Sequence, residues 1–502
     1  MTSRLNYPHK FFNRLLLPMP QLKGKSRLSE MQARFEGVVG GDSDTRIPPP
    51  SGADEASSLT VSRAFRSTLQ QSLLRFRPAS LSERGIVQGL FSLADQAVAS
   101  ITNFVTGVIL ARACSKEEFG LYMLALTLIL LVTDIQTTLI ATPYMVYGPR
   151  LKGRAQAIYS GSTLIHQMAF SIIAMAALGV GVLLTHFGWG PRGIGPVLWV
   201  LLAVISLIMF REFVRRMCFA QLKVGAALIF DAGIGIAQLG GLLLMAHFGL
   251  LSPSRAFSLI GLICGIGGAC WLWANRSSYS PRFREAIADL KLNWRFGKWV
   301  FASGLLWAVS TNIYPWLLAF FHGTAAAGVF AACAGVVSAG NPALLGIQNF
   351  VGPKIAHEYA ARGPYALRRL TLKISGLIAI PVFALTVILV IWGDRFVGML
   401  YGHQYMGNRL AISVLACNLP IVVIAFSFSR ALFAIERADL DFWLNLIAVA
   451  MMASAGIWLV RSYGPLGAAL GMVVATLVPS CARVAVFLRA TARRPDAAEE
   501  GV

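Results

Sequence analysis

The stretch "LADQAVASITNFVTGVILAR", residues 93–112, is long and apolar enough to cross a bilayer as one helix. It nevertheless carries Asp95, Gln96 and Asn103 at positions where a lipid-facing helix would have Leu or Val. The whole chain of 502 residues is 56% hydrophobic and only 13% charged, whereas charged residues make up about a quarter of a soluble domain. Its apolar runs are continuous, which favours helices over the alternating strands of a barrel. We predict an all-α polytopic membrane protein.

Hydropathy divides the chain into polar tails and about twelve predicted transmembrane helices. The spans fall near 86–111, 120–146, 158–186, 195–214, 224–248, 255–275, 298–321, 325–350, 371–392, 409–433, 439–460 and 464–487. The polar residues 1–83 predict a disordered cytoplasmic tail, and 491–502 predict a second one. The charged stretch 276–297 predicts a cytoplasmic loop between an N-lobe, helices 1–6 over 84–275, and a C-lobe, helices 7–12 over 298–490. Because six is even, both halves enter with the same orientation, as parallel repeats do.

The distribution of Lys and Arg predicts the orientation of these helices. With a cytoplasmic N-terminus, the inward loops and the C-terminal tail after residue 86 carry 24 of these residues, and the outward loops carry 7. Both termini are therefore expected in the cytoplasm. The net charge of +21 then reflects topology and contact with anionic membrane lipids, and it predicts no nucleic-acid partner.

The polar residues of 93–112 lie on one side of the predicted helix. With Asp95 at zero degrees and a step of about 100° per residue, Asp95, Gln96 and Asn103 fall in one polar arc with several Thr, Ser and Gly residues. An ionised Asp near the bilayer centre costs about 3 kcal/mol or more, so this arc must meet partners or water. Two interpretations stay open: a contact with polar groups of neighbouring helices, or the wall of a water-filled central cavity.

Arginines gather at the predicted cytoplasmic ends of two spans. Arg211 and Arg215 are four residues apart on one face of the fourth span, and Arg430 closes the tenth. A pair of guanidinium groups suits the bidentate binding of phosphate oxygens, so these residues are candidates for a phosphate site. Two other interpretations stay open, namely positive-inside anchoring and a structural ion pair with Asp231.

Three carboxylates inside spans, those of Asp95, Asp134 and Asp231, are candidates for coupling to H⁺ or Na⁺. No other cofactor is expected. The seven cysteines are scattered, and no phosphate-binding loop, HExxH, GxSxG or Cys/His cluster occurs. The sequence "DLD" at 439–441 has the spacing of a glycosyltransferase metal motif, but no catalytic domain surrounds it. We therefore expect neither a metal site nor an enzyme.

The opening of the helical region resembles a known family. The resemblance is carried by the polar residues of the first helix, "LAR" at 110–112, "EEFGLY" at 117–122 and "FREFVRR" at 210–216. These are similar to bacterial polysaccharide biosynthesis membrane proteins, the lipid-linked oligosaccharide flippases for O-antigen and exopolysaccharide. That family belongs to the multidrug/oligosaccharidyl-lipid/polysaccharide exporter superfamily. The resemblance is best over 86–240, and over 297–490 it consists of helix count and spacing.

The resemblance implies two six-helix lobes around a central cavity that opens to each side in turn, in the inner membrane of a bacterium. The implied substrate is an undecaprenyl-diphosphate-linked oligosaccharide for lipopolysaccharide or exopolysaccharide, and glycan polymerase and export proteins are candidate partners. The residues expected to hold the diphosphate are Arg211, Arg215 and Arg430, and those expected to line the sugar path are Asp95, Gln96, Asn103 and Asp134. The alternatives are a cation-coupled multidrug exporter of the same superfamily and a non-transporting scaffold in a glycan assembly complex.

Overall fold

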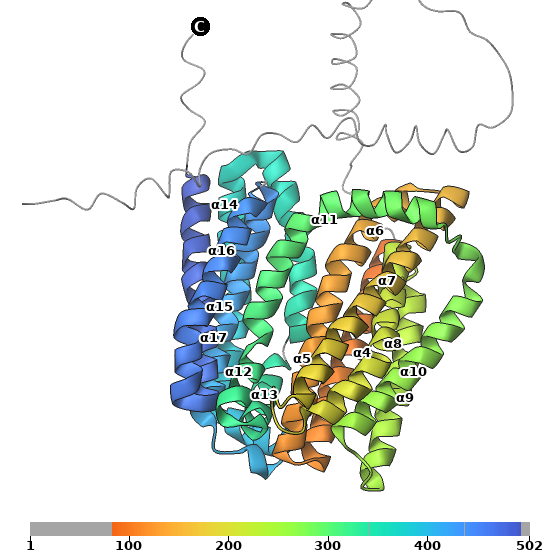
Figure 1. Ribbon diagram of the computed structural model, residues 1–502. Helices are drawn as coiled ribbons and strands as arrows, with labels where there is room; N and C mark the ends of the chain where they lie inside the picture. Colours follow the sequence, from red (N-terminus) through yellow and green to blue (C-terminus); the bar gives the residue numbers. More distant parts are fainter. Residues whose placement is uncertain (1–82, 340, 436, 493–502) are drawn as a thin grey trace, which may run out of the picture. The chain divides into compact units, whose positions relative to one another are not determined.

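The computed structural model describes residues 83–339, 341–435 and 437–492 of the chain (Figure 1). Its contacts divide the chain into two units, Met1–Leu90 and Phe91–Val502. In the first unit only residues 83–90 are described, and they are helical. The two predicted tails, 1–83 and 491–502, therefore lie almost entirely outside the described residues. The features below belong to the second unit.

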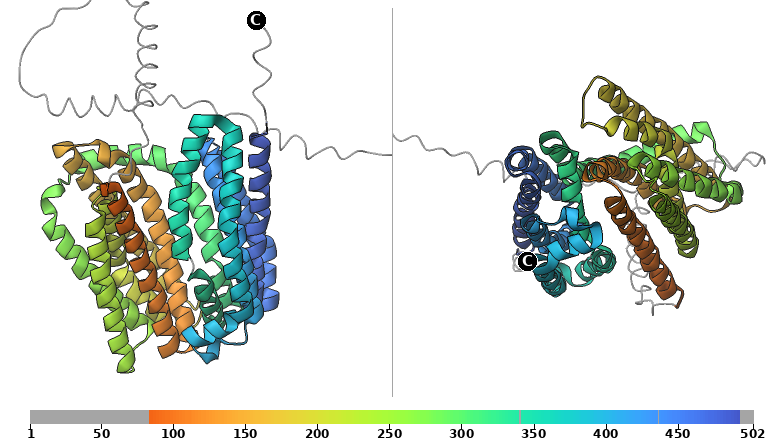
Figure 2. Two further views of the ribbon diagram at one scale, coloured as in Figure 1. Left: turned by 180° about the vertical axis from the view of Figure 1, so that it is seen from behind. Right: turned by 90° about the horizontal axis from the view of Figure 1, so that it is seen from below.

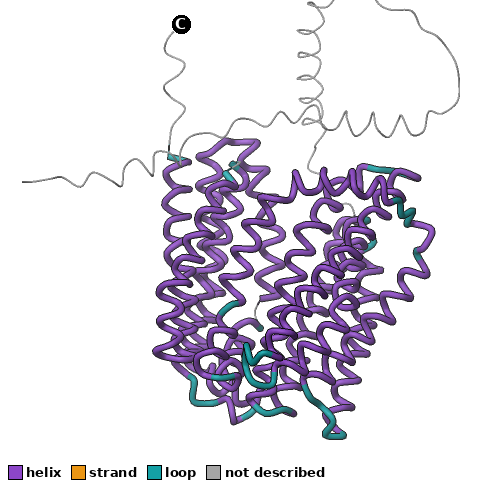
Figure 3. The backbone as a smooth tube through the Cα atoms, viewed as in Figure 1, coloured by secondary structure: helices purple, strands orange, loops and turns teal. Residues whose placement is uncertain are grey.

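The first half of this unit contains the first six predicted spans. They are α4 (Glu83–Ala113), α5 (Lys116–Gln136), α7 (Gly153–His186), α8 (Ile194–Ala220), α9 (Val224–His247) and α10 (Pro253–Ala274). A π-helical turn, η1 (Thr137–Ala141), and the short α6 (Thr142–Tyr147) complete the second span. Figure 3 shows that every regular element among the described residues is a helix, which confirms the predicted all-α fold.

The second half contains more broken helices. They are α11 (Phe283–Asn312), α12 (Tyr314–His322), α13 (Thr324–Ser338), α14 (Asn341–Tyr401), α15 (Arg409–Ala434), α16 (Ala438–Met451), η5 (Met452–Gly456) and α17 (Ile457–Ala490). Ten described segments are long and apolar enough to span a membrane. The segment Leu440–Ala490 is divided at Gly464, where a φ of 54° interrupts the helix, and the short apolar α13 begins a further span. The prediction of about twelve spans is confirmed.

The helices of Phe91–Val502 form two groups, which correspond to the predicted N-lobe and C-lobe. Helices α7, α8, α9 and α10 contact one another in the first group, and α14, α15, α16 and α17 do so in the second. The groups meet where α5 packs against α13 and where α11 contacts α5 and α7 (Figure 2). We call the end with connections 148–152, 221–223 and 275–282 the basic end, and the end with connections 114–115, 187–193 and 402–408 the far end.

The segment predicted as an inter-lobe loop, 276–297, is helical over most of its length. After the turn η3 (Arg276–Ser278), α11 begins at Phe283 and continues without interruption into the seventh span. Its charged residues suggested a loop, but the apolar residues between them recur at helical spacing, which favours an amphipathic helix. The connection between the lobes is therefore a helix.

Candidate functional site

Two arginines of α8 and two aspartates of neighbouring helices form a buried charge network. Arg215 donates to Asp95 Oδ2 of α4 from Nη2 at 2.7 Å and from Nε at 3.0 Å, and its Nε lies 2.8 Å from Asp231 Oδ2 of α9. Arg211 donates to Asp231 Oδ1 from Nη2 at 3.0 Å and from Nε at 3.1 Å. Both carboxylates are fully buried. The α-helical spacing of four residues places both guanidinium groups beside one carboxylate.

The charge network is balanced, with three guanidinium groups and three carboxylates once Glu212 and Arg216 of α8 are included. Removing one member of such a buried set leaves an unpaired charge, which costs about 3–5 kcal/mol. Glu212 joins the network because its Oε1 lies 3.7 Å from Arg215 Nη1 and 2.6 Å from Arg216 Nε. Gln96 also belongs here, because its Oε1 accepts from Arg215 Nη2 at 3.3 Å. The network therefore ties the first helix to the fourth and the fifth.

The polar arc of α4 consists of two stripes with different surroundings. The buried stripe is Asp95, Thr102 and Thr106. Thr106 accepts a hydrogen bond from Gln238 of α9 at 2.9 Å, and a Cβ placed on Gly235 of α9 would lie 2.6 Å from Thr102 Oγ1. A side chain at Gly235 would therefore force Thr102 to move. This stripe corresponds to the helix–helix interpretation of the sequence.

The second stripe of α4 consists of Gln96, Ser100, Asn103 and Gly107, about 80–140° around the helix from Asp95. Asn103 is exposed, and Gln96 and Ser100 are half-buried. A Cβ on Gly107 would meet nothing within 4 Å. We call these four residues the exposed stripe. Asn103 in this stripe is polar and exposed, as the cavity-wall interpretation requires, whereas Asp95 is buried.

The remaining predicted site residues, Asp134 and Arg430, are both exposed. Asp134 lies one turn before Thr138, whose hydroxyl donates to the Asp134 carbonyl and whose Oγ1 would lie 3.5 Å from a Cβ on Gly304 of α11. Asp134 itself lies near Arg216 and Glu212 of α8, whereas Thr138 faces α11 of the C-lobe. The Arg430 guanidinium lies 4.5 Å from the ring centre of Phe426. Within the described part of the chain neither residue has an ion-pair partner, and the charge network does not include them.

A second buried ion pair, which the sequence reasoning missed, lies in the C-lobe. Arg483 of α17 donates to Asp441 Oδ1 of α16 at 2.9 Å, and the Ser429 hydroxyl donates to the same oxygen at 2.9 Å. Asp441 is the last residue of "DLD", and Arg483 interrupts the apolar twelfth span, which was the available signal. The fifth helix of each lobe therefore carries a buried aspartate paired with an arginine.

The lobes contact each other at the far end. Arg112, in the last turn of α4, donates from Nε to the Leu400 carbonyl at 2.8 Å and from Nη2 to the Met399 carbonyl. Gln404 donates in the other direction, to the Ala111 carbonyl at 3.0 Å. Beside these bonds is a pocket of about 610 Å³, which Cys114 helps to line. Burial, with a smaller contribution from Glu118, raises the pKa of Cys114 to about 11, so its thiol is protonated near neutral pH.

Helices α5 and α13 meet at the same end through backbone contact. A Cβ on Gly120 of α5 would overlap the Thr324 carbonyl, and one on Gly328 of α13 would overlap the Lys116 carbonyl. Only glycine at both positions permits this approach. Aromatic packing of Phe119 against Tyr401 and Tyr405, with ring centres 6.1 and 5.8 Å apart, extends the contact. The far end is closed in this conformation.

These features define a multi-pass membrane protein with the two-lobe fold of the exporter superfamily. Residues 86–353 match the family model described as "Polysaccharide biosynthesis protein", and the chain belongs to that family. The family predicted from the first helices is thereby confirmed. No curated protein matches the chain.

Solved structures share the fold at low sequence identity. An inward-facing multidrug resistance MATE family transporter of the MOP superfamily matches at a TM-score of 0.66 and 15% identity, covering 80% of this chain and 98% of its own. The lipid II flippase MurJ in an inward closed conformation matches at 0.61 and 17%, covering 81% and 88%. An outward-facing MATE family transporter matches at 0.56 and 16%, covering 81% and 95%. These similarities establish the fold of the chain.

Proposed function

We propose that the protein is a flippase that moves a polyprenyl-diphosphate-linked oligosaccharide from the cytoplasmic to the outer leaflet by alternating access, for surface polysaccharide synthesis. The observation that carries the proposal is the exposed stripe of α4. Sugar hydroxyls need hydrogen-bond partners at membrane depth, and the exposed Asn103 offers them without a net charge. Beside it, Gln96 donates to Ser100 and accepts from Arg215, so these two side chains support the stripe. Membership of the polysaccharide biosynthesis family and the fold shared with a lipid II flippase support the same class of substrate.

On this proposal the basic end lies in the cytoplasm of a bacterium, at the inner membrane, with both termini inside. The closed far end then faces outward, and the substrate enters from the basic end. Export requires the bonds of Arg112 and Gln404 across the far end to break. Glycan polymerase and export proteins are the partners that would receive the product.

The arginines predicted to hold the diphosphate differ in how readily they can bind phosphate oxygens. Arg430 is exposed and is not ion-paired within the described residues, so it is the best candidate to meet the diphosphate first. Arg211 and Arg215 already bind Asp231 and Asp95, and phosphate oxygens would have to replace those carboxylates. Their proposed role in binding therefore requires the charge network to open.

The three carboxylates proposed to bind a coupling cation also differ in whether they are already ion-paired. Asp95 and Asp231 are each neutralised by a guanidinium group, so adding H⁺ or Na⁺ would leave the buried network with excess positive charge. Asp134 is exposed and has no ion-pair partner among the described residues. If transport is coupled to a cation, Asp134 is the carboxylate that we propose to bind it.

A reconstituted flipping assay tests the proposal. Purified protein is placed in liposomes that carry a fluorescent polyprenyl-diphosphate oligosaccharide, and a membrane-impermeant reagent reports the outer-leaflet fraction. Arg430→Gln should lower the initial rate about tenfold at limiting substrate, because it removes a charged hydrogen bond to phosphate. The matched control is Arg461→Gln, another exposed arginine, at the far-end side of α17. Absence of flipping across several glycans and imposed ion gradients would reject the proposal.

A cation-coupled multidrug exporter is the second candidate, and the exposed Asp134 favours it because a carboxylate attracts cationic drugs and repels diphosphate. Such an exporter should confer resistance to cationic dyes on a susceptible host, and Asp134→Asn should remove that resistance. A flippase should leave dye susceptibility unchanged. A non-transporting scaffold predicts that glycan export in cells survives loss of both Asn103 and Asp134.

A further inference from the structure

The first part of α11 has an inverted amphipathic pattern. Its large apolar residues are exposed, namely Phe283 (77%), Ile287 (62%), Leu290 (53%) and Trp294 (50%). They recur after four, three and four residues, so they form one stripe along the helix. A neighbouring side of the helix, with Ala286, Asp289 and Asn293, is buried. A helix that hides its polar side and exposes its apolar side is not adapted to water.

The buried side of this segment packs against α7. Tyr159 donates to Asn293 Oδ1 at 2.9 Å, His166 Nε2 is 2.8 Å from the Ala286 carbonyl, and Ser280 donates to the Ala157 carbonyl at 2.9 Å. These α7 residues lie between about 6 and 20 Å along the axis from the start of α7 at Gly153. The segment therefore covers the side of α7 near its basic end.

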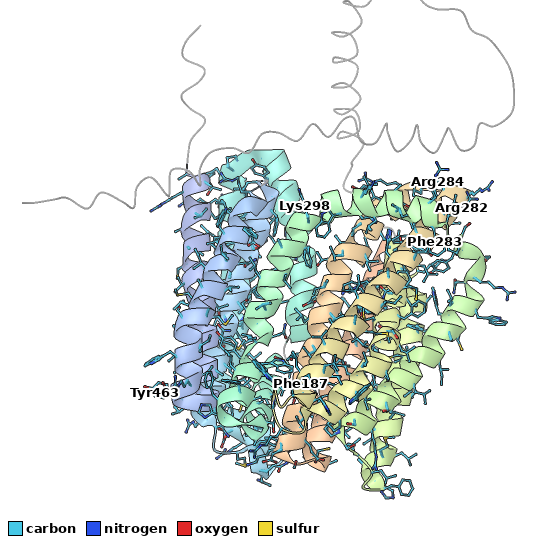
Figure 4. All side chains as sticks on the ribbon, in the orientation of Figure 1. Phe187, Arg282, Phe283, Arg284, Lys298 and Tyr463 are labelled. Atoms are coloured by element: carbon cyan, nitrogen blue, oxygen red, sulfur yellow. The ribbon has the colours of Figure 1, made fainter. Side chains whose placement is uncertain are left out.

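The exposed charges of the segment have one sign. Arg284 and Lys291 are exposed, whereas Glu285 is half-buried and Asp289 is buried. Figure 4 shows Arg282, Phe283 and Arg284 together at the start of α11, and Lys298 where the helix turns into the bundle. An apolar stripe bordered by basic side chains is the pattern of a helix that lies in a membrane interface and attracts anionic lipid.

We propose that residues 283–294 of α11 lie in the leaflet at the basic end and bind anionic phospholipid, with the apolar stripe among the acyl chains and Arg284 and Lys291 at the headgroup phosphates. The same helix continues to Asn312 in the C-lobe while its first part is bound to α7 of the N-lobe. The bound lipid thus contacts the helix that connects the two lobes. This proposal is independent of the transported substrate.

Quenching of Trp294 tests the location of the stripe. The protein is reconstituted in nanodiscs, and the emission of Trp294 is obtained by subtracting the spectrum of Trp294→Phe from that of the unchanged protein. Lipids brominated near the glycerol end of the acyl chains should quench this emission, and aqueous iodide should not. Quenching by iodide alone would place the stripe in water, and quenching by neither reagent would place it against protein. Either result overturns the proposal.

Native mass spectrometry tests the preference for anionic lipid. The protein is released from nanodiscs that contain equal amounts of phosphatidylglycerol and phosphatidylcholine, and the retained lipids are counted. The double variant Arg284→Gln, Lys291→Gln should lower the preference for phosphatidylglycerol about fivefold for each charge removed. The matched control is Arg150→Gln, Lys152→Gln, which removes one exposed arginine and one exposed lysine from a connection at the same end. An equal loss in the control would show general charge attraction and overturn the site.

Discussion

The two stripes of α4 are made of similar polar residues, yet their surroundings differ. The buried stripe, with Asp95, Thr102 and Thr106, is bound by Arg215 of α8 and Gln238 of α9. The exposed stripe, with Asn103 and its neighbours, has no such contact at Asn103 among the described residues. The comparison separates two uses of polarity inside a membrane. The buried stripe holds the N-lobe together, and Asn103 of the exposed stripe is available to a ligand.

The largest expected effect comes from breaking the charge network. Arg215→Ala leaves Asp95 buried without its partner, so we expect a loss of about 3–5 kcal/mol in the free energy of unfolding. The measurement is thermal unfolding of the purified protein in detergent, followed by far-UV circular dichroism.

The double variant Asp95→Leu, Arg215→Met provides the control for that prediction. It removes one charge of each sign and leaves Arg211 with Asp231 and Arg216 with Glu212. It should be more stable than Arg215→Ala, because the unpaired charge is gone. A double variant that is less stable than the single one would show that the two residues stabilise the lobe separately.

The ion pair of the C-lobe should matter less than the network of the N-lobe. Arg483→Met removes the arginine from Asp441, but Ser429 still donates to that carboxylate. The Asp441 side chain also retains 11% exposure, whereas those of Asp95 and Asp231 retain none. We expect a loss of about 1.5–3 kcal/mol, as for a hydrogen bond to a charged group. Thermal unfolding compared with Arg215→Ala measures the difference, and an equal loss would contradict the ranking.

A smaller effect is expected at the close approach of α4 and α9. Gly235→Ala forces Thr102 to move, which should cost about 1–3 kcal/mol. Gly233→Ala is the matched control on the same helix, because a Cβ there meets nothing within 4 Å. The control should be neutral or slightly stabilising, since Ala favours a helix over Gly by about 1 kcal/mol. Equal melting temperatures for the two variants would show that the approach of α9 to Thr102 is not tight.

Hydropathy was sufficient to predict the membrane-spanning helices, because each span must satisfy its own backbone in lipid. Helical geometry also predicted the polar arc of α4. It did not separate the two stripes, because that depends on Gly235 and Arg215, more than a hundred residues away in the sequence. The helical part of α11 was missed because its apolar stripe is interrupted by charges whose surroundings the sequence does not specify. The sequence-based predictions were therefore incomplete for residues whose environment is set by distant parts of the chain.

The smallest effect on stability, with the largest effect on transport, is expected in the exposed stripe. Asn103→Leu removes an amide that is exposed in the structure, so the free energy of unfolding should change by about 0.5 kcal/mol or less. Export of the lipid-linked glycan should be abolished, because Leu offers no hydrogen bond to a sugar. The control is Ile101→Leu, at a position of the same helix that is 58% exposed on the apolar arc. Full export by Asn103→Leu, with a protein level matched to Ile101→Leu, would assign the exposed stripe a role other than sugar contact.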